Sequence, residues 1–222
     1  MNYELMNNNK VYLCGVVVRE GIFSHSYYGE NFYEYLFSVQ RLSESYDTIP
    51  VLISERIIND SLKIGNTVAV KGQYRSYNKF VDGKSKLVLS VFARDILEKD
   101  LSQNPNQITL SGFVCKEPIY RTTPFKREIC DVLVAVNRAY NKSDYIPCIA
   151  WGRNARYVKN FKVGDKIEIM GRIQSREYQK KIDEDKYETK TAYEISITRI
   201  KVSNGTPIIP TTISTTSSVA NQ

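Results

Sequence analysis

The sequence repeats itself, and this repeat is the feature that most limits what the chain can fold into. Three segments recur at nearly constant spacing. They are LFSVQR at 36–41 with LVAVNR at 133–138, DTIPVLI at 47–53 with DYIPCIA at 144–150, and IGNTVAVKG at 64–72 with VGDKIEIMG at 163–171. The first two pairs are 97 residues apart and the third is 99 residues apart. A spacing kept over so long a stretch predicts two copies of one folding unit.

The repeat divides the chain into four parts. We predict a first domain at 8–97, a linker at 98–105 that contains the polar run SQNP, and a second domain at 106–201. A length of 222 residues accommodates two small domains. The remaining residues, 202–222, are rich in serine and threonine and carry no charge, so we expect a disordered tail.

The hydrophobic pattern favours strands in both copies. Val, Ile, Tyr and Phe recur in short runs of period two, bounded by Gly, Asn, Asp and Lys. One segment per copy is expected to be helical, roughly 55–62 in the first and 153–161 in the second. Three strands, a short helix and two further strands are the elements of a five-stranded OB-type Greek-key barrel. We therefore predict an all-β chain of two tandem OB-fold barrels, with one short helix per domain.

Several classes of function are disfavoured by the composition. The four cysteines lie far apart without a C-x-x-C pair, which predicts free thiols in a cytoplasmic protein and no zinc finger. The single histidine, His25, has no accompanying Ser, Cys or Asp arrangement and is interpreted as an exposed loop residue. The only dense carboxylate cluster, 183–185, is expected to be a solvated hairpin tip. We therefore expect no enzymatic activity, no metal and no cofactor.

Charge and aromatic content point instead to a polyanionic partner. The chain has a net charge of +7, and it contains 16 Tyr, 8 Phe and 1 Trp. The charge is uneven, because residues 9–96 carry +2 whereas residues 106–201 carry +7. Basic charge combined with amphipathic rings suits a nucleic acid whose bases can be stacked upon. The second domain is expected to bind more strongly than the first.

Alternate residues of a strand share a face, so the strand at 145–151 can be divided into an inner and an outer set. We expect the outer set to be Tyr145, Pro147, Ile149 and Trp151. The first copy has Thr48 and Ser54 where the second has Tyr145 and Trp151. Since a core would need large residues in both copies, the difference predicts a role beyond packing. The alternative is that Trp151 covers the short helix or a subunit contact.

The following strand shows a similar outer face. In the second copy this face is predicted to carry Arg172, Gln174, Arg176 and Tyr178, and in the first copy Lys71, Arg75 and Tyr77. Cations interleaved with aromatic rings fit a nucleic-acid backbone with stacked bases, and a solvated charged face is the alternative. Four further cations are candidate phosphate contacts: Arg138, Arg153, Arg156 and Lys180.

The second copy resembles the bacterial single-stranded-DNA-binding protein (SSB) family. The resemblance is carried by LSGFVCKEPIYRTTP, LVAVNRAY, DYIPCIAWG and GRIQSREY, and it extends more weakly to the first copy. It implies base-stacking aromatics at Tyr145, Trp151 and Tyr178, with a further one near Tyr140, and a family arginine at Arg176. It also implies a two-OB-domain variant that forms a homodimer with four OB domains. The chain ends in STTSSVANQ, without the family's acidic tip, so the resemblance does not extend to recruitment of replication or repair proteins.

The sequence thus predicts non-sequence-specific binding of single-stranded DNA in replication, recombination or repair, by a cytoplasmic, nucleoid-associated protein. RNA remains a possible ligand, because stacking does not read the 2′-hydroxyl. The alternative function is an OB-fold adaptor of a replication or primosome complex, acting mainly through protein contacts. An adaptor would bind DNA weakly.

Overall fold

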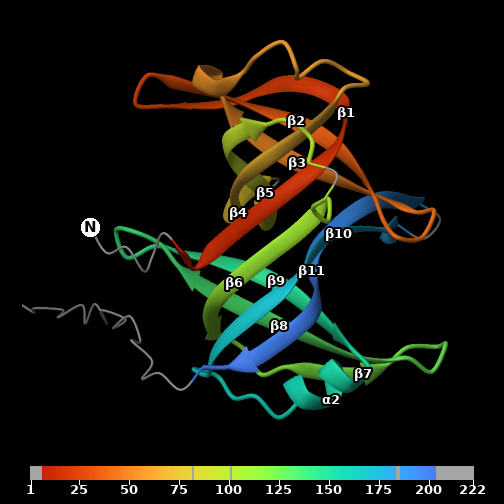
Figure 1. Ribbon diagram of the computed structural model, residues 1–222. Coiled ribbons are helices and arrows are strands. Elements are labelled where there is room, and N and C mark those ends of the chain that lie inside the picture. Colours follow the sequence, from red (N-terminus) through yellow and green to blue (C-terminus); the bar gives the residue numbers. More distant parts are fainter. Residues whose placement is uncertain (1–6, 82, 101, 184–185, 204–222) are drawn as a thin grey trace, which may run out of the picture.

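The computed structural model describes residues 7–81, 83–100, 102–183 and 186–203, most of which lie in β-strands (Figure 1). The first module contains β1 (Asn9–Tyr27), β2 (Glu30–Gln40), β3 (Tyr46–Ser54), β4 (Thr67–Val81) and β5 (Lys84–Leu97). The second contains β6 (Asn106–Val114), β7 (Ile119–Thr122), β8 (Glu128–Asn137), β9 (Ser143–Trp151), β10 (Lys166–Asp183) and β11 (Lys186–Val202). The predicted tail falls almost wholly outside the described residues.

Each module closes its strands into a barrel of five. In the first, β1 pairs with β2, β2 with β3, β3 with β5, β5 with β4, and β4 returns to β1. In the second, β6, β8, β9, β11 and β10 form the same ring, and β7 adds an extra strand beside β8. The only parallel pairings described are β3–β5 and β9–β11. The prediction of two tandem five-stranded OB barrels is therefore confirmed.

The helical segments differ between the modules. The second has the short helix α2 (Arg153–Val158), whose Ala155 and Val158 are buried. The first has only the 3₁₀ turn η1 (Glu55–Ile57), so the expected helix at 55–62 is wrong. The Asn59 side chain accepts the backbone N–H of Ser61 at 3.0 Å. Such a local side-chain bond gives the backbone an alternative to helical hydrogen bonding.

On β9 and β10 the strand faces follow the expected alternation except at two positions, and on β3 Pro50 and Ser54, expected outside, are also buried. Ile146, Cys148 and Ala150 are buried in the second barrel, as predicted. Ile149 was expected outside but is buried, opposite Asp131 on β8 and beside β11.

Gln174 was also expected outside and is also buried. Its amide Nε2 donates to Glu194 Oε1 at 2.6 Å, and its Oε1 accepts from Arg172 at 3.1 Å. Hydrogen bonds compensate for the burial of this polar side chain.

The two barrels share one sheet. β1 pairs antiparallel with β6 from Asn9 opposite Leu110 to Leu13 opposite Asn106, and these strands run side by side through the centre of Figure 1. The Asn9 side chain bonds both the N–H and the carbonyl of Tyr74, at 2.8 and 2.7 Å. Asn106 bonds both groups of a β10 residue in the same way. The modules therefore form one continuous structure.

A buried aspartate of the second module is held by the first. Asp144 is fully buried, and its Oδ1 accepts the backbone N–H of Ser76 at 2.9 Å. Its Oδ2 accepts Nη1 of Arg75 at 2.8 Å. Arg138, from its own module, approaches Oδ1 at 3.4 Å.

The first module contributes the matching aspartate. Asp47 is 1% exposed, and it accepts the backbone N–H of Ser175 and Nη1 of Arg172, both at 2.7 Å. Arg41, from its own module, adds an Nε bond at 2.9 Å. We refer to the bonds around Asp47 and Asp144 as the two aspartate clamps. They are related by a pseudo-twofold axis, as in the isologous interface of a symmetric dimer.

Removal of either buried carboxylate should destabilise the whole chain, because it leaves arginines and a backbone N–H without an acceptor. We expect Asp144→Ala and Asp47→Ala each to lower the free energy of unfolding by about 3 kcal/mol, measured by urea denaturation. Asp60→Ala is the control, because the Asp60 side chain is 99% exposed. A result for Asp144→Ala within about 0.5 kcal/mol of the control would contradict the role of the clamp.

Candidate nucleic-acid interface

Two aromatic side chains stand on the outer face of β9. Tyr145 is 47% exposed near the start of the strand, and Trp151 is 37% exposed at its end. They are six positions apart along the strand, which corresponds to about 20 Å. The equivalent residues of β3, Thr48 and Ser54, are half-buried and buried. At these two pairs of equivalent positions, the structure therefore places exposed rings on β9 and not on β3.

The surroundings of Trp151 combine an apolar neighbour with cations. Trp151 lies opposite Ile129 on β8, and α2 begins two residues further on with the exposed Arg153. Arg156 is also exposed, and its Nε lies 3.3 Å from Glu128 Oε2. The positive charge near the Trp151 ring therefore comes from Arg153 and Arg156 of α2, the helix that follows β9.

The first module has an aromatic pair on the neighbouring strands, at the tyrosine-rich segment 26–35 that is the alternative aromatic surface of this module. Ser54, the counterpart of Trp151, lies opposite Phe32 on β2, and Phe32 lies opposite His25 on β1. The His25 and Phe32 rings are stacked, with centroids 5.1 Å apart and planes inclined by 14°. His25 is exposed and belongs to the β1–β2 hairpin rather than to a loop. The long tyrosine-rich run around it was the available signal.

Tyr178 and Arg176 form a unit on β10. The Arg176 guanidinium lies 5.9 Å from the centre of the Tyr178 ring, within the range of a cation–π contact. Arg176 is also 4.0 Å from Glu194, a marginal ion-pair distance. Lys180, two residues beyond Tyr178, is exposed on the same strand. This group therefore offers one ring and two cations to a ligand.

Three predicted phosphate contacts lie in the aspartate clamps instead of on a free surface. Arg75 and Arg138 contact Asp144, and Arg172 contacts Asp47. Burial lowers the pKa of Arg75 and of Arg172, and the facing carboxylate partly offsets this. Because these guanidinium groups are engaged by buried carboxylates, the geometry favours a structural role for them.

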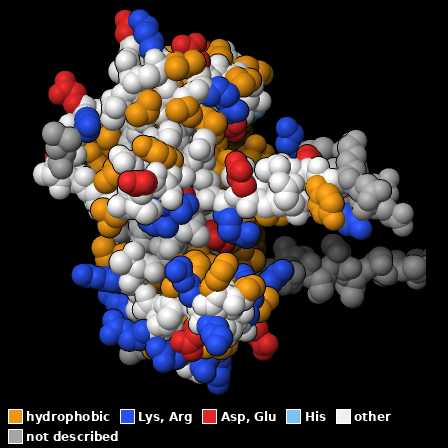
Figure 2. Space-filling view, turned by 90° about the vertical axis from the view of Figure 1, so that its right-hand side faces the viewer, with side chains coloured by type: hydrophobic (Ala, Val, Ile, Leu, Met, Phe, Trp, Pro, Cys, Tyr) orange, Lys and Arg blue, Asp and Glu red, His pale blue; other side chains and the backbone are white. Residues whose placement is uncertain are grey.

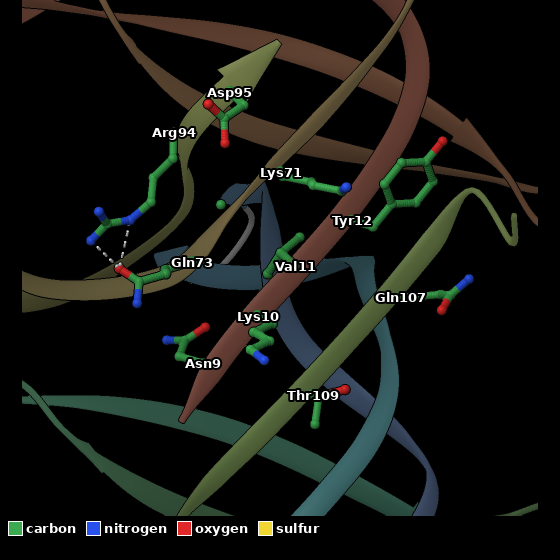
Figure 3. A pocket seen from close by; sticks show the side chains of 11 residues that line it. Asn9, Lys10, Val11, Tyr12, Lys71, Gln73, Arg94, Asp95, Gln107 and Thr109 are labelled. Atoms are coloured by element: carbon green, nitrogen blue, oxygen red, sulfur yellow. Dashed lines mark hydrogen bonds between the residues drawn. The ribbon is translucent and has the colours of Figure 1, made fainter. Parts of the chain in front are cut away.

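The remaining predicted residues are scattered. Tyr140 is 94% exposed in the turn between β8 and β9, where its φ is 60°. Tyr77 is exposed on β4. Lys71 lines a pocket on the sheet that joins the barrels, together with residues of β1, β5 and β6 (Figure 3). Neither Tyr77 nor Lys71 belongs to β9, which carries the two exposed rings.

The pocket in Figure 3 has a volume of about 340 Å³. Lys10, Lys71 and Arg94 provide its positive charge, and Asp95 provides a negative one. Arg94 is bonded to the Gln73 amide oxygen at 2.9 Å. This surface is basic and polar, and the two exposed rings of β9 do not line it.

The surface charge follows the division into modules. In Figure 2, Lys and Arg side chains are dense over the lower half of the molecule, and hydrophobic side chains are more prominent on the upper half. The upper half is the first module and the lower half is the second (Figure 1). The exposed rings of β9 therefore belong to the more basic module.

The thiols are poorly suited to chemistry. All four cysteines are free, and burial raises the pKa of Cys130 to about 11 and that of Cys148 further.

Within the described ranges, no group of three or more His, Cys, Asp or Glu side chains is arranged to hold a metal ion. None of the helices described is long and apolar enough to cross a membrane.

Comparison with known proteins identifies the second module. Residues 105–202 match the single-strand binding protein family. The single-stranded DNA-binding protein A of Bacillus subtilis is 35% identical over 81 residues, which cover 33% of this chain and 47% of that protein. A single-stranded DNA-binding protein of Staphylococcus aureus shows the same identity, with 48% of its length covered. The chain thus spans about half the length of the curated relatives it matches.

The likeness of fold extends over both modules. The single-stranded DNA binding protein from Thermus aquaticus superimposes with a TM-score of 0.68, covering 91% of this chain and 96% of that one at 20% identity. A deletion mutant of the same protein gives a TM-score of 0.65. The tandem arrangement of two barrels is therefore a known architecture.

Proposed function

We propose that the chain binds single-stranded DNA without strong sequence preference, because its second module matches the single-strand binding protein family over residues 105–202. Bases would stack on exposed rings, and cations would contact the phosphates. This type of binding is sequence-tolerant because every base has a π-face. A cytoplasmic, nucleoid-associated role in replication, recombination or repair is part of the same proposal.

The observation that carries the proposal is the pair of half-exposed rings on β9, Tyr145 and Trp151, in the module that matches the family. Tyr178 adds a third ring on β10, and the Arg176 guanidinium lies over it. Aromatic rings exposed beside cations are the groups on which the bases of a single strand stack.

The proposed phosphate contacts are fewer than the sequence suggested. Arg153, Arg156, Arg176 and Lys180 are all exposed on the second module. We leave out Arg172 and Arg138, because each contacts a buried aspartate.

Trp151 is the ring to test first, because it is the only tryptophan and its fluorescence reports on one position. Oligo-dT should quench this fluorescence. Trp151→Ala should weaken binding by about 1–3 kcal/mol, the usual contribution of one stacked base, measured by anisotropy of labelled oligo-dT.

The matched control for this variant is Tyr157→Ala. Tyr157 is as exposed as Tyr145, but it lies on α2 and packs edge-on against Phe161. Its removal should leave binding unchanged. Tight binding of oligo-dT with unaltered Trp151 emission would exclude Trp151 from the site.

Binding should also depend on salt, because four cations would release counterions from the phosphates. The slope of log K against log salt concentration should be about −3, at roughly 0.7 per contact on a single strand. Arg153→Ala should reduce the slope by about 0.7, whereas Arg172→Ala should lower stability and leave the slope unchanged. A flat salt response would instead favour an adaptor that acts through protein contacts.

We further propose that two chains associate into a homodimer with four barrels. The basis is the family resemblance, together with the prevalence of twofold symmetry among homo-oligomers. Analytical ultracentrifugation at micromolar concentration should give about twice the chain mass of 25.5 kDa. Sedimentation at the mass of one chain would refute the dimer without affecting the proposed DNA site.

A further inference from the structure

We propose that Ser76 of the first module positions Tyr145 of the second for base stacking. This inference rests on the proposed function, since it assigns a role to a residue behind one of the proposed stacking rings. It makes the first module part of the binding site without requiring it to contact DNA at that ring.

The contact between the two residues is direct. The backbone N–H of Tyr145 donates to Ser76 Oγ at 2.7 Å, and the backbone N–H of Ser76 donates to Asp144 Oδ1 at 2.9 Å. Arg75 adds its bond to the other oxygen of Asp144 at 2.8 Å. Residues 144 and 145 are therefore held by three hydrogen bonds from two consecutive residues of the other module.

The position of Tyr145 explains why such support matters. It is the third residue of β9 (Ser143–Trp151), directly after a turn in which Tyr140 and Asn141 both have positive φ. β11 pairs with β9 only further along, at Cys148 and Ile149. At Tyr145, β9 is paired with β8 on one side. The N–H of Tyr145 is bonded instead to Ser76 Oγ of the first module.

Anchoring the backbone limits the directions that the ring can take. Fixing one residue's backbone costs conformational entropy, and that cost falls on DNA binding if the residue is loose beforehand. The hydrogen bond to Ser76 fixes the backbone of Tyr145 in the protein without DNA. Its loss should weaken stacking at Tyr145 although Ser76 itself is buried.

The pseudo-twofold symmetry provides a matched control. In the other aspartate clamp, the backbone N–H of Thr48 donates to Ser175 Oγ at 2.9 Å, and the N–H of Ser175 donates to Asp47 at 2.7 Å. The Ser175 hydroxyl therefore accepts the backbone N–H of Thr48 as the Ser76 hydroxyl accepts that of Tyr145. Thr48 has no aromatic ring, so loss of its anchor should not affect stacking.

The experiment compares Ser76→Ala with Ser175→Ala in the full chain. Both should lower the denaturation midpoint to a similar extent. Ser76→Ala should weaken oligo-dT binding about threefold to tenfold, the range that one hydrogen bond accounts for, while Ser175→Ala changes it less than twofold. In a Tyr145→Ala background, Ser76→Ala should have no further effect on affinity. Equal effects of the two serine variants, or an undiminished effect of Ser76→Ala without Tyr145, would overturn the proposal.

Amide hydrogen exchange without DNA separates this inference from the proposed function. Ser76→Ala should speed exchange at the Tyr145 amide and Ser175→Ala at the Thr48 amide, each without affecting the other. The absence of this crossed pattern would refute the positioning role. If the pattern is present but wild-type protein does not bind oligo-dT, or Tyr145→Ala binds as wild type does, then the proposed function or its assignment to Tyr145 is what fails.

Discussion

Two buried carboxylates, Asp47 and Asp144, determine how the rest of the molecule is arranged. A carboxylate removed from water is costly unless donors surround it, and here the essential donors come from the opposite module. Each barrel supplies one arginine to its own aspartate, and the other module supplies a second arginine and a backbone N–H. The two barrels therefore behave as one unit, and the pairing of β1 with β6 continues the same union through the backbone.

The positions of the repeat are of two kinds: those with the same residue in both modules and those with different residues. Residues kept in both copies make equivalent contacts. Asn9 and Asn106 each bond within their own module, and Ser76 and Ser175 each bond a residue of the other module. A residue that differs, such as Trp151 against Ser54, is free of that requirement. The shared serines thus lie at the interface between the modules, and the differing aromatic residues lie at the candidate site.

The sequence predicted the two barrels and the outward rings of β9. Period-two alternation and the long repeat can both be recognised from the order of the residues alone. It did not predict the aspartate clamps. Arg75 and Arg172 reach equivalent carboxylates from positions that are not aligned in the repeat, each beside a buried glutamine. The sequence shows that an arginine is present, but only the folded structure shows whether a carboxylate from the other module already engages it. For this reason Arg138 and Arg172 are not among the proposed phosphate contacts.

The division between the modules follows from the same constraint. Ser76 and Arg75 of the first barrel contact the second barrel at the interface. These contacts do not require the outer faces of β3 and β9 to carry the same side chains. Its strand β3 has Thr48 and Ser54 at the positions of the two β9 rings, while its neighbouring hairpin has the stacked pair of His25 and Phe32. That pair lies in line with Ser54, where the second module has Trp151, but Phe32 is buried beneath its neighbours. The first module therefore has a structural role at the interface, through Ser76 and Arg75, and it lacks exposed rings at the two positions where β9 carries them.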